Sequence, residues 1–274
     1  MEQKGSMKIG KYDLRYDKFP HYKKLLGRKF INNMQTKPVF VVGNQRSGTT
    51  MLLSKLNRHF WVDIFHESSN AMIDWELKSF IELDKIISNS KAKVCIFKPL
   101  EETHRVNDLL EYFKDSKAIF IFRHYSDVIN SSMKLGWGRH LKQYIQNIND
   151  GTKFKYSGPL NLTEKNARLI RELYHDDLTE ESCVALIWYL RNTIYPDYIL
   201  RDDPRVLLTQ YEKVVTDPKK EMERILSFMD LRPSKSVFYK IVIKSIRKES
   251  QPQIDERIEN ICNEMFEILV ALVP

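Results

Sequence analysis

The chain has 274 residues, 42% of them hydrophobic and 29% charged, and it carries a formal net charge of +8. These values are typical of a globular protein, and no linker divides residues 1–274 into more than one domain. The sequence excludes a membrane-spanning helix, because no uncharged apolar run approaches the roughly 20 residues that one needs. No tract of interleaved basic and aromatic residues indicates a nucleic-acid partner, and the basic excess favours an anionic ligand.

Residues 1–37 are polar and basic and contain no apolar signal core. We expect them to be peripheral, with one short helix over 22–30, and we expect a cytoplasmic protein. Cys95, Cys183 and Cys262 are scattered in apolar surroundings without C-x-x-C spacing. That pattern fits buried, reduced thiols better than disulfides or a zinc site.

The most informative stretch is 38–56, which reads PVFVVGNQRSGTTMLLSKL. Its apolar run, 39–42, is typical of a buried parallel strand. Gly43 ends the run, and the leucines after Thr50 supply the apolar face of a helix. A strand, a glycine loop and a helix start form a phosphate cradle, because the unpaired N–H groups and the positive dipole of a helix N-terminus attract an anion.

The loop departs from the Walker A pattern of nucleotide triphosphatases at one decisive position. Gly43 and Gly48 have the Walker A spacing, but Thr49 stands where the lysine should be, and the cation is Arg46, earlier in the loop. Backbone amides, hydroxyls and one guanidinium can hold a terminal phosphate without the lysine that acts beside magnesium. The residues expected to do so are Arg46, Ser47, Gly48, Thr49 and Thr50. An ordinary strand–helix turn stays an alternative.

Later apolar runs have the length and composition of short buried strands, at 62–65, 94–97, 118–122 and 206–209. Helical patterns fall between them, at 103–113, 126–135 and 179–190, and another starts at Asp217-Pro218. Strands that alternate with helices predict an α/β fold with a mostly parallel sheet. Right-handed crossovers then place the phosphate loop at the carboxyl ends of the strands, where ligands bind in such sheets.

Residues 136–180 differ from the rest, since they combine glycines and a proline with lysines, asparagines and tyrosines and show no sustained period. We interpret this segment as an insertion over the site, partly mobile. It is either a substrate lid or an inert surface excursion.

A second cation follows the strand predicted over 118–122. Arg123 comes directly after this strand, and Ser131 lies eight residues later in the next helix. Two helical turns span about 12 Å, so the two side chains meet only if the strand end turns back beside the helix. A phosphate held between them would explain the arrangement; the alternative is an arginine at the surface or the sheet edge.

These features together resemble the sulfotransferases that use 3′-phosphoadenosine-5′-phosphosulfate (PAPS). Residues 46–50 match the loop that grips the 5′-phosphosulfate side in the bacterial and Golgi form of that family, which carries arginine where the cytosolic vertebrate form carries lysine. Arg123 and Ser131 match the family's 3′-phosphate motif in residue type and spacing. Asp127 matches an acidic position between them, whereas Tyr125 replaces the common proline.

A third block, 207–231, resembles the family's segment of a strand, Tyr-Glu, Asp-Pro and a helix, whose tyrosine, here Tyr211, often lies near the adenine. The resemblance therefore covers residues 38–231 in three ordered blocks. It implies a three-layer P-loop-like fold with a central, mostly parallel sheet flanked by helices. It also implies PAPS as cofactor, no metal, and transfer of the sulfuryl group to a hydroxyl or amine. Because the sequence shows no signal peptide or membrane anchor, we expect a small-molecule acceptor, such as a natural product, and not a Golgi glycan or a secreted tyrosine.

The same resemblance suggests a general base. In the cytosolic vertebrate branch a histidine lies two residues after a strand-end lysine, but here the lysine is Lys98 and that position is Leu100. In the tyrosylprotein-sulfotransferase branch the base is a glutamate 21 residues beyond the loop arginine, and Glu67 has that spacing from Arg46. We hypothesise that Glu67 is the base and that Lys98 and Arg46 stabilise charge on the bridging and sulfuryl oxygens. The alternatives for the base are His66 and His104.

Arg247 and Lys248 resemble the cationic C-terminal segment that closes over the 3′-phosphate in relatives, although Glu249 replaces the expected glycine. The acceptor is expected to contact 68–80, 134–179 and the C-terminus. Four acidic residues near that pocket favour a cationic or amine-bearing acceptor, unless they are simply exposed carboxylates. They are Asp74, Glu76, Glu101 and Glu102.

Two other function classes stay open. A P-loop kinase for nucleotides or small molecules would use the same glycine loop, but the missing loop lysine speaks against it. A non-catalytic nucleotide-binding module would keep an intact cofactor site and give no sulfated product.

Overall fold

The computed structural model describes residues 27–28, 35–151, 162–198, 200–241, 246 and 250–273. Except for residues 27 and 28, the helix expected over 22–30 lies outside this part of the chain, as does the basic pair Arg247 and Lys248. Within the segment expected to be peripheral, Arg28 is buried, and its Nη1 lies 2.8 Å from Asp63 Oδ1.

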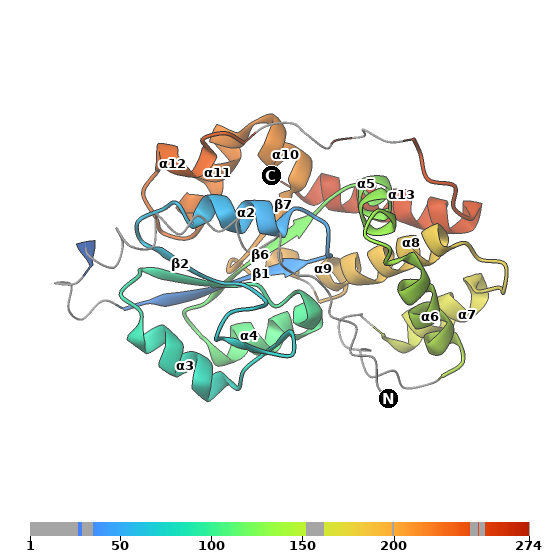
Figure 1. The fold of residues 1–274 in the computed structure, drawn as a ribbon, viewed down its shortest axis with the longest axis horizontal. Coiled ribbons are helices and arrows are strands. Elements are labelled where there is room, and N and C mark those ends of the chain that lie inside the picture. The colour runs from blue at the N-terminus through green and yellow to red at the C-terminus, as the bar shows by residue number, and fades with distance from the viewer. Residues whose placement is uncertain are drawn as a thin grey trace, which may run out of the picture.

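A five-stranded sheet forms the centre of the molecule (Figure 1), and all of its pairs are parallel. The strands lie in the order β2-β5-β1-β6-β7. Their bounds are Lys37–Gly43 (β1), Val62–Phe65 (β2), Val94–Phe97 (β5), Lys117–Phe122 (β6) and Val206–Gln210 (β7). All five strands expected from the sequence are confirmed. A separate antiparallel hairpin, β3 (Met72–Ile73) and β4 (Glu76–Leu77), was not expected.

The apolar runs form central strands because helices cover both faces of the sheet. Successive side chains of a strand point to opposite faces, so Phe40 and Val42 belong to one hydrophobic cluster and Val39 and Val41 to the other. Helices α2 (Thr49–Leu56) and α11 (Pro218–Phe228) cover one face, and α3 (Phe80–Asn89) and α4 (Val106–Tyr112) lie on the other (Figure 1). This confirms the three-layer architecture.

Helix starts follow the local capping signals. Thr179 Oγ1 accepts a hydrogen bond from the Ser182 amide at 3.1 Å, and α8 (Glu180–Asn192) begins there as predicted. Asp217 caps α11 through the Lys220 amide. The helix expected over 126–135 is α5 (Tyr125–Met133), and the one expected over 103–113 begins as a 3-10 segment, η2 (Leu100–Arg105), before it continues as α4.

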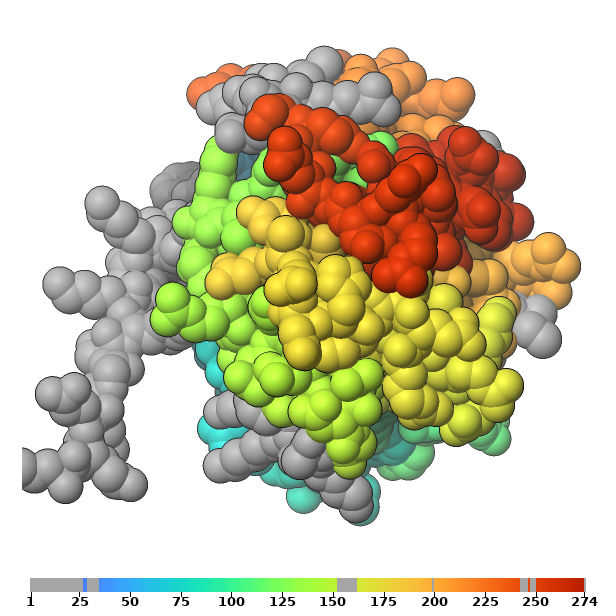
Figure 2. Space-filling view, turned by 90° about the vertical axis from the view of Figure 1, so that its right-hand side faces the viewer, coloured from blue at the N-terminus to red at the C-terminus, as the bar shows by residue number. Residues whose placement is uncertain are grey.

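The described residues of 136–180 form regular helices, although the sequence shows no sustained period there. They form α6 (Gly138–Asn149) and α7 (Glu164–Leu173), and α6 packs against both α7 and α8. Tyr144, Ile145 and Ile170 are buried there. Figure 2 shows the surface that these helices form together with the C-terminal helix α13 (Glu256–Leu272, red). The high density of polar residues hid a narrow apolar stripe on each helix.

Two longer helices were also missed. The pair Ser79 and Glu82 forms a capping box at the start of α3. Asp255 caps α13, whose buried residues Ile258, Cys262 and Leu269 lie on one helical face. The remaining short elements are α9 (Ile194–Asp197), η3 (Leu200–Asp202), α10 (Tyr211–Thr216) and α12 (Lys235–Phe238).

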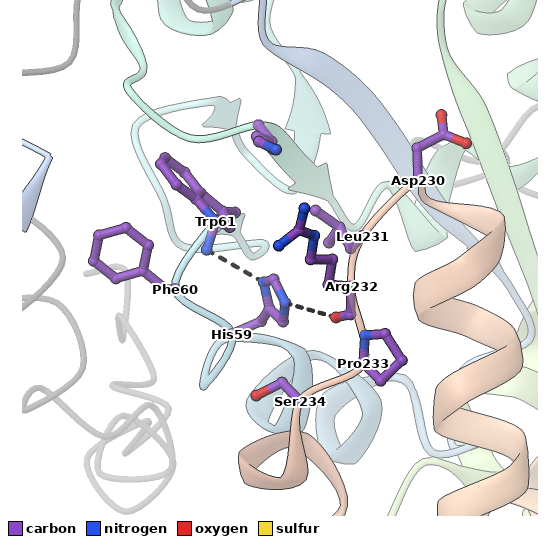
Figure 3. Close-up of a pocket in the computed structure, with 9 residues that line it drawn as sticks. His59, Phe60, Trp61, Asp230, Leu231, Arg232, Pro233 and Ser234 are labelled. Carbon is purple, nitrogen blue, oxygen red and sulfur yellow. Dashed lines mark hydrogen bonds between the residues drawn. The ribbon is translucent and has the colours of Figure 1, made fainter.

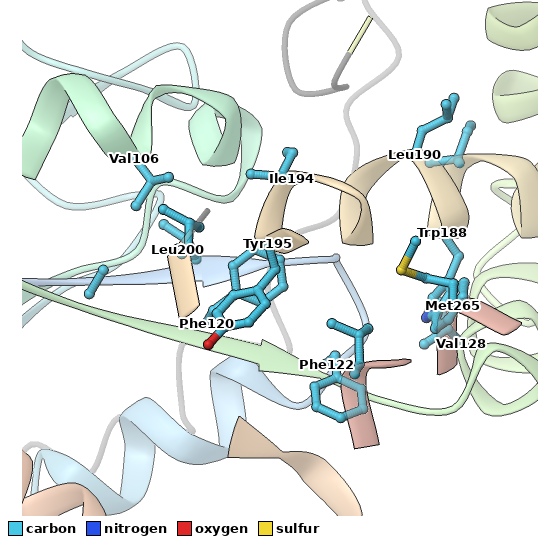
Figure 4. Close-up of a cluster of buried hydrophobic side chains, with 14 of the residues drawn as sticks. Val106, Phe120, Phe122, Val128, Trp188, Leu190, Ile194, Tyr195, Leu200 and Met265 are labelled. Carbon is cyan, nitrogen blue, oxygen red and sulfur yellow. The ribbon is translucent and has the colours of Figure 1, made fainter. Parts of the chain in front are cut away.

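The larger hydrophobic cluster joins the sheet to α8 and α13 (Figure 4). At its centre Trp188 is fully buried, and its Nε1 donates a hydrogen bond to the Arg123 carbonyl at 2.9 Å. The expectation of reduced, buried thiols is confirmed, because all three cysteines are free and buried. Burial raises the pKa of Cys183 to about 11 and that of Cys95 to about 12. In the part of the chain described here, no helix combines the length and the apolar character needed to cross a membrane.

Candidate active site

The predicted site residues gather at one edge of the sheet because each of them follows a parallel strand. The glycine loop follows β1, Lys98 follows β5, Arg123 follows β6, and Tyr211 follows β7. Parallel strands place their carboxyl ends at one edge, which is where ligands bind in open α/β sheets. Glu67 comes from the segment after β2, so all five strands contribute to this edge.

Two glycines allow the loop to adopt its path. Gly43 has a φ of 127°, and a Cβ there would lie 2.3 Å from the Ile121 carbonyl oxygen. Gly48 has a φ of 88°, and a Cβ there would lie 2.2 Å from the ring of Tyr211. Thr103 fixes the start of the loop, since its Oγ1 lies 3.2 Å from the Gly43 amide and 3.1 Å from the Gly43 carbonyl. No residue with a side chain fits at either glycine.

The loop and the start of α2 together fit an anion. Ser47 is fully buried, yet within the described residues its Oγ has no hydrogen-bond partner. Helix α2 begins at Thr49 after Gly48, and no side chain in the described ranges caps its start. A buried hydroxyl without a partner is costly, and a phosphate oxygen can accept its hydrogen bond. The N-terminal amides of α2 offer further donors to the same group.

Arg46 links the two predicted anion sites. Its Nε donates a hydrogen bond to Ser131 Oγ at 2.9 Å, and its carbonyl lies 3.4 Å from Arg123 Nη1. Arg46 itself has a φ of 66°, and its guanidinium carbon lies 5.7 Å from the ring centre of Trp137. Arg123 and Ser131 therefore both contact Arg46, one at its carbonyl and the other at its side chain, so the two residues of the predicted phosphate site meet at the same loop residue.

An ion pair and a ring contact also hold the Arg123 guanidinium in place. Its Nη2 forms an ion pair of 3.1 Å with Asp127, and its carbon atom lies 4.5 Å from the ring centre of Tyr211. Glu212, the residue after Tyr211, accepts a hydrogen bond from the His124 amide at 3.0 Å. Burial raises the pKa of Glu212. The end of β7 thus fixes the segment that carries Arg123.

Glu67 and Lys98 form the second part of the site. Lys98 Nζ lies 2.7 Å from Glu67 Oε1 and 3.1 Å from Thr50 Oγ1, although these residues come from three separate segments. Lys98 is 3% exposed, whereas the Glu67 side chain is 20% exposed. Burial lowers the pKa of Lys98, with the Glu67 carboxylate opposing this effect and Arg46 adding to it. The pair places a carboxylate and a cation beside the phosphate loop.

The two alternative bases lie in different surroundings. His66 Nδ1 accepts a hydrogen bond from the Ser68 amide at 3.2 Å, which occupies one ring nitrogen. Burial lowers the pKa of His104, and the nearby charges of Arg105 and Arg191 lower it further, while Asp108 opposes them. Of the three candidates, Glu67 is the one that the structure brings into direct contact with Lys98.

Two of the four acidic residues expected near the acceptor are already paired inside the protein. Glu101 accepts hydrogen bonds from Gln45 and from Arg191 Nη2. Glu102 accepts hydrogen bonds from the Leu77 amide and from Arg105. Asp74 and Glu76 are exposed on the hairpin β3–β4. A cationic acceptor stays a prediction, but two of the four carboxylates on which it was based already have partners within the protein.

Sequence reasoning missed Trp137, Trp188 and Gln45 as members of the site. Trp188 lies 65 residues from Arg123, whose carbonyl it binds, and no local pattern announces such a contact. Gln45 lies in the glycine loop itself, so its position in the sequence could have predicted that it belongs to the site. Among the described residues, no group of histidine, cysteine or acidic side chains could hold a metal ion.

Comparison with known proteins decides the family. A family model of the sulfotransferase domain matches residues 36–262. The chain belongs to the sulfotransferase family. The match of this sulfotransferase domain includes the glycine loop, Glu67, Lys98, Arg123, Ser131 and Tyr211. No curated protein sequence matches the chain.

Solved sulfotransferase structures share the fold. The sulfotransferase domain from the curacin biosynthetic pathway is 11% identical, with a TM-score of 0.53 over 85% of this chain and 99% of that one. The sulfotransferase domain from the Synechococcus PCC 7002 olefin synthase is 14% identical, with a TM-score of 0.53 over 86% of this chain and 97% of that one. At these identities the similarity shows a common fold.

Proposed function

We propose that this sulfotransferase uses PAPS and transfers its sulfuryl group to a hydroxyl or amine of a small-molecule acceptor without a metal ion. The observation that carries the proposal is the meeting of three features at one sheet edge. They are the glycine loop, the Arg123–Ser131 site and the ion pair of Lys98 with Glu67. A doubly phosphorylated nucleotide needs two separated anion sites, and the glycine loop and the Arg123–Ser131 pair support this reading as the two candidates.

The residues of the loop fit the 5′-phosphosulfate side of the cofactor. Ser47 Oγ is buried without a partner, and the start of α2 offers amide donors. Arg123 and Ser131 fit the 3′-phosphate, and the Tyr211 ring, packed on Gly48, lies between the two sites. The Arg46 backbone belongs to the loop, and its guanidinium contacts Ser131 of the second site.

The proposed chemistry needs one proton acceptor and one or two cations. PAPS supplies an activated sulfuryl group, and the phosphate oxygen that leaves takes the electrons of the S–O bond. Glu67 takes the proton of the acceptor hydroxyl or amine as the new bond to sulfur forms. Lys98, 2.7 Å from Glu67 and beside Thr50, stabilises the negative charge that develops on the leaving oxygen.

The missing loop lysine separates this proposal from a kinase. A kinase of this type relies on the lysine and magnesium to neutralise the β- and γ-phosphates, and Thr49 occupies the lysine position here. A natural-product acceptor, a lid role for α6 and α7, and a cytoplasmic location stay predictions.

Binding of 3′,5′-adenosine bisphosphate (PAP), the expected product, tests the proposal. We expect PAP in EDTA to raise the melting temperature, because a ligand at 100 times its dissociation constant stabilises the native state by about 2.7 kcal/mol. For a chain of this size that corresponds to roughly 5–10 °C. ATP with magnesium should give a far smaller shift. The reverse ranking would favour the kinase, and PAP binding without sulfated product from any acceptor would favour a non-catalytic module.

The lowered pKa of Lys98 predicts how PAP binding depends on pH. An ordinary lysine loses its charge near pH 10.4, and burial moves this loss in Lys98 to lower pH. We therefore expect PAP affinity to fall on the alkaline side before that value is reached, because the neutral amine no longer attracts the nucleotide. Calorimetric titrations with PAP at a series of alkaline pH values measure this fall in affinity. The Lys98→Arg variant should show a flatter profile, and an unchanged profile in this variant would assign the fall to another group.

A further inference from the structure

The sheet has a second charged edge, at the amino ends of its strands. Lys93 directly precedes β5, Lys37 begins β1, and Lys117 begins β6. These three strands are neighbours in the order β5-β1-β6. Since adjacent strands lie about 4.8 Å apart, the topology places three lysines in a staggered row along the edge opposite the candidate active site, with Lys37 paired to Val94 and Lys117 paired to Val39.

One acidic residue partly neutralises this row. Asp230 Oδ2 lies 2.9 Å from Lys117 Nζ and 3.3 Å from Lys37 Nζ, and these lysines lower the pKa of Asp230, the Lys117 hydrogen bond most strongly. One carboxylate therefore faces two ammonium groups. Lys93, the third lysine of the row, forms no ion pair with any residue that the structure describes.

A cavity of about 560 Å³ opens beside Lys93 and Asp230 (Figure 3). Phe60 and Trp61 form its aromatic wall, with their ring centres 4.8 Å apart and their planes at 83°. Lys93 Nζ lies 5.3 Å from the ring centre of Trp61. The opposite wall is the segment after Asp230, which includes Arg232. This volume lies in the range of small-molecule sites.

His59 forms hydrogen bonds with both walls of the cavity. Its Nδ1 accepts a hydrogen bond from the Trp61 amide at 3.2 Å, so the Nε2, which carries the proton, donates to the Arg232 carbonyl at 3.2 Å. The ring is 5% exposed. A buried side chain with a partner for each nitrogen holds the cavity in shape, so that its walls need little ordering when a ligand enters.

The cavity is positively charged. Lys93 and Arg232 line it, both are exposed, and Arg232, like Lys93, has no ion-pair partner within the described ranges. The single lining carboxylate, Asp230, is already shared by Lys37 and Lys117. An indole wall beside two available cations is suited to a flat ring that carries a negative group.

We propose that this cavity binds a small aromatic anion. The ring contacts Trp61 and Phe60, and the sulfonate, sulfate, phosphate or carboxylate group lies between Lys93 and Arg232. The cavity is distinct from the candidate active site, because Lys93 and Lys98 lie at opposite ends of β5, roughly 16 Å apart at the rise of a parallel strand. It is a second binding site on the sulfotransferase, on the other edge of the same sheet.

Titration with 2-naphthalenesulfonate tests the proposal on the full-length protein, by calorimetry and by quenching of tryptophan fluorescence. We expect saturable binding that weakens about tenfold or more in the Lys93→Ala/Arg232→Ala variant, because two charge-assisted contacts are lost. Lys235→Ala, an exposed lysine outside the cavity, serves as the matched control and should bind as the wild type does. Neutral 2-naphthalenesulfonamide, with the same ring, should bind far more weakly.

The same titration on an Arg46→Gln/Arg123→Gln variant shows whether the naphthalenesulfonate binds at the candidate active site instead. Binding there should weaken in this variant, whereas binding in the cavity should not change. Absence of saturable binding overturns the proposal, as does a loss below about threefold in the Lys93→Ala/Arg232→Ala variant, the size expected for an incidental surface charge. Equal binding of the sulfonamide overturns the anion part. If the Lys93→Ala/Arg232→Ala variant melts early, Trp61→Phe gives a second measurement, since it should remove most of the quenching while Trp75, Trp137 and Trp188 remain.

Discussion

Replacing Glu67 by glutamine should lower kcat by 10²–10⁴-fold, the usual loss when a general base is removed. The amide keeps the size of the side chain and can still contact Lys98, which lies 2.7 Å from Glu67 Oε1. It cannot take a proton from the acceptor. Transfer of labelled sulfate from PAPS to any acceptor that the wild-type protein modifies measures the effect, and PAP affinity should change by less than about threefold because the anion sites stay intact.

Glu111→Gln is the matched control, because Glu111 is an exposed carboxylate on α4, outside the segments expected to contact the acceptor. Its kcat should equal that of the wild type. If Glu67→Gln turns over within about tenfold of wild type, Glu67 is not the base, and the same assay on His66→Gln and His104→Gln would identify which histidine replaces it.

The Trp188→Ala variant should lose roughly 3–5 kcal/mol of unfolding free energy, the range for removing a large buried aromatic side chain. Trp188 is fully buried, and its Nε1 donates to the Arg123 carbonyl. Its removal leaves both a cavity and a carbonyl without a donor. Urea titration measures the loss of stability, and calorimetry should show weaker PAP binding, because the residue that carries the predicted 3′-phosphate ligand is no longer held.

Trp188→Phe separates the two effects. It keeps most of the ring volume and removes the N–H donor, so the expected loss of stability is about 1–3 kcal/mol, the cost of one unsatisfied buried carbonyl. PAP affinity should fall in this variant as well. Unchanged PAP affinity in Trp188→Ala would show that the guanidinium contacts of Arg123, which include Asp127, Tyr211 and the Arg46 carbonyl, position it without the Trp188 hydrogen bond.

The sheet could be predicted because each strand is a short, continuous apolar run between polar residues. Runs such as 94–97 and 62–65 coincide with β5 and β2. Helices with mixed composition were harder to predict. In α6 and α7 only a narrow stripe is apolar, so charged and amide side chains dominate the composition, and the burial of Ile145 and Ile170 depends on packing with α8.

The site could be predicted in its parts and not in its arrangement. The spacing of the glycine loop and of Arg123 with Ser131 identified two anion sites. Neither spacing predicts that Arg46 would join them through Ser131, or that the Tyr211 ring would pack on Gly48. These contacts join segments more than 80 residues apart, and such distances carry no periodic signal in a sequence.

The sequence by itself determined the apolar runs, the capped helix starts and the two loop glycines with positive φ. These features depend on near neighbours and on backbone sterics. Tertiary structure alone decided the strand order and thereby both charged edges of the sheet. Parallel pairing brought Glu67, Lys98 and Arg123 together at the carboxyl ends, and it placed Lys93, Lys37 and Lys117 on neighbouring strands at the amino ends. Strand pairing joins segments that are far apart in the sequence, and the pairing that forms is the one that buries the apolar surface of the whole core.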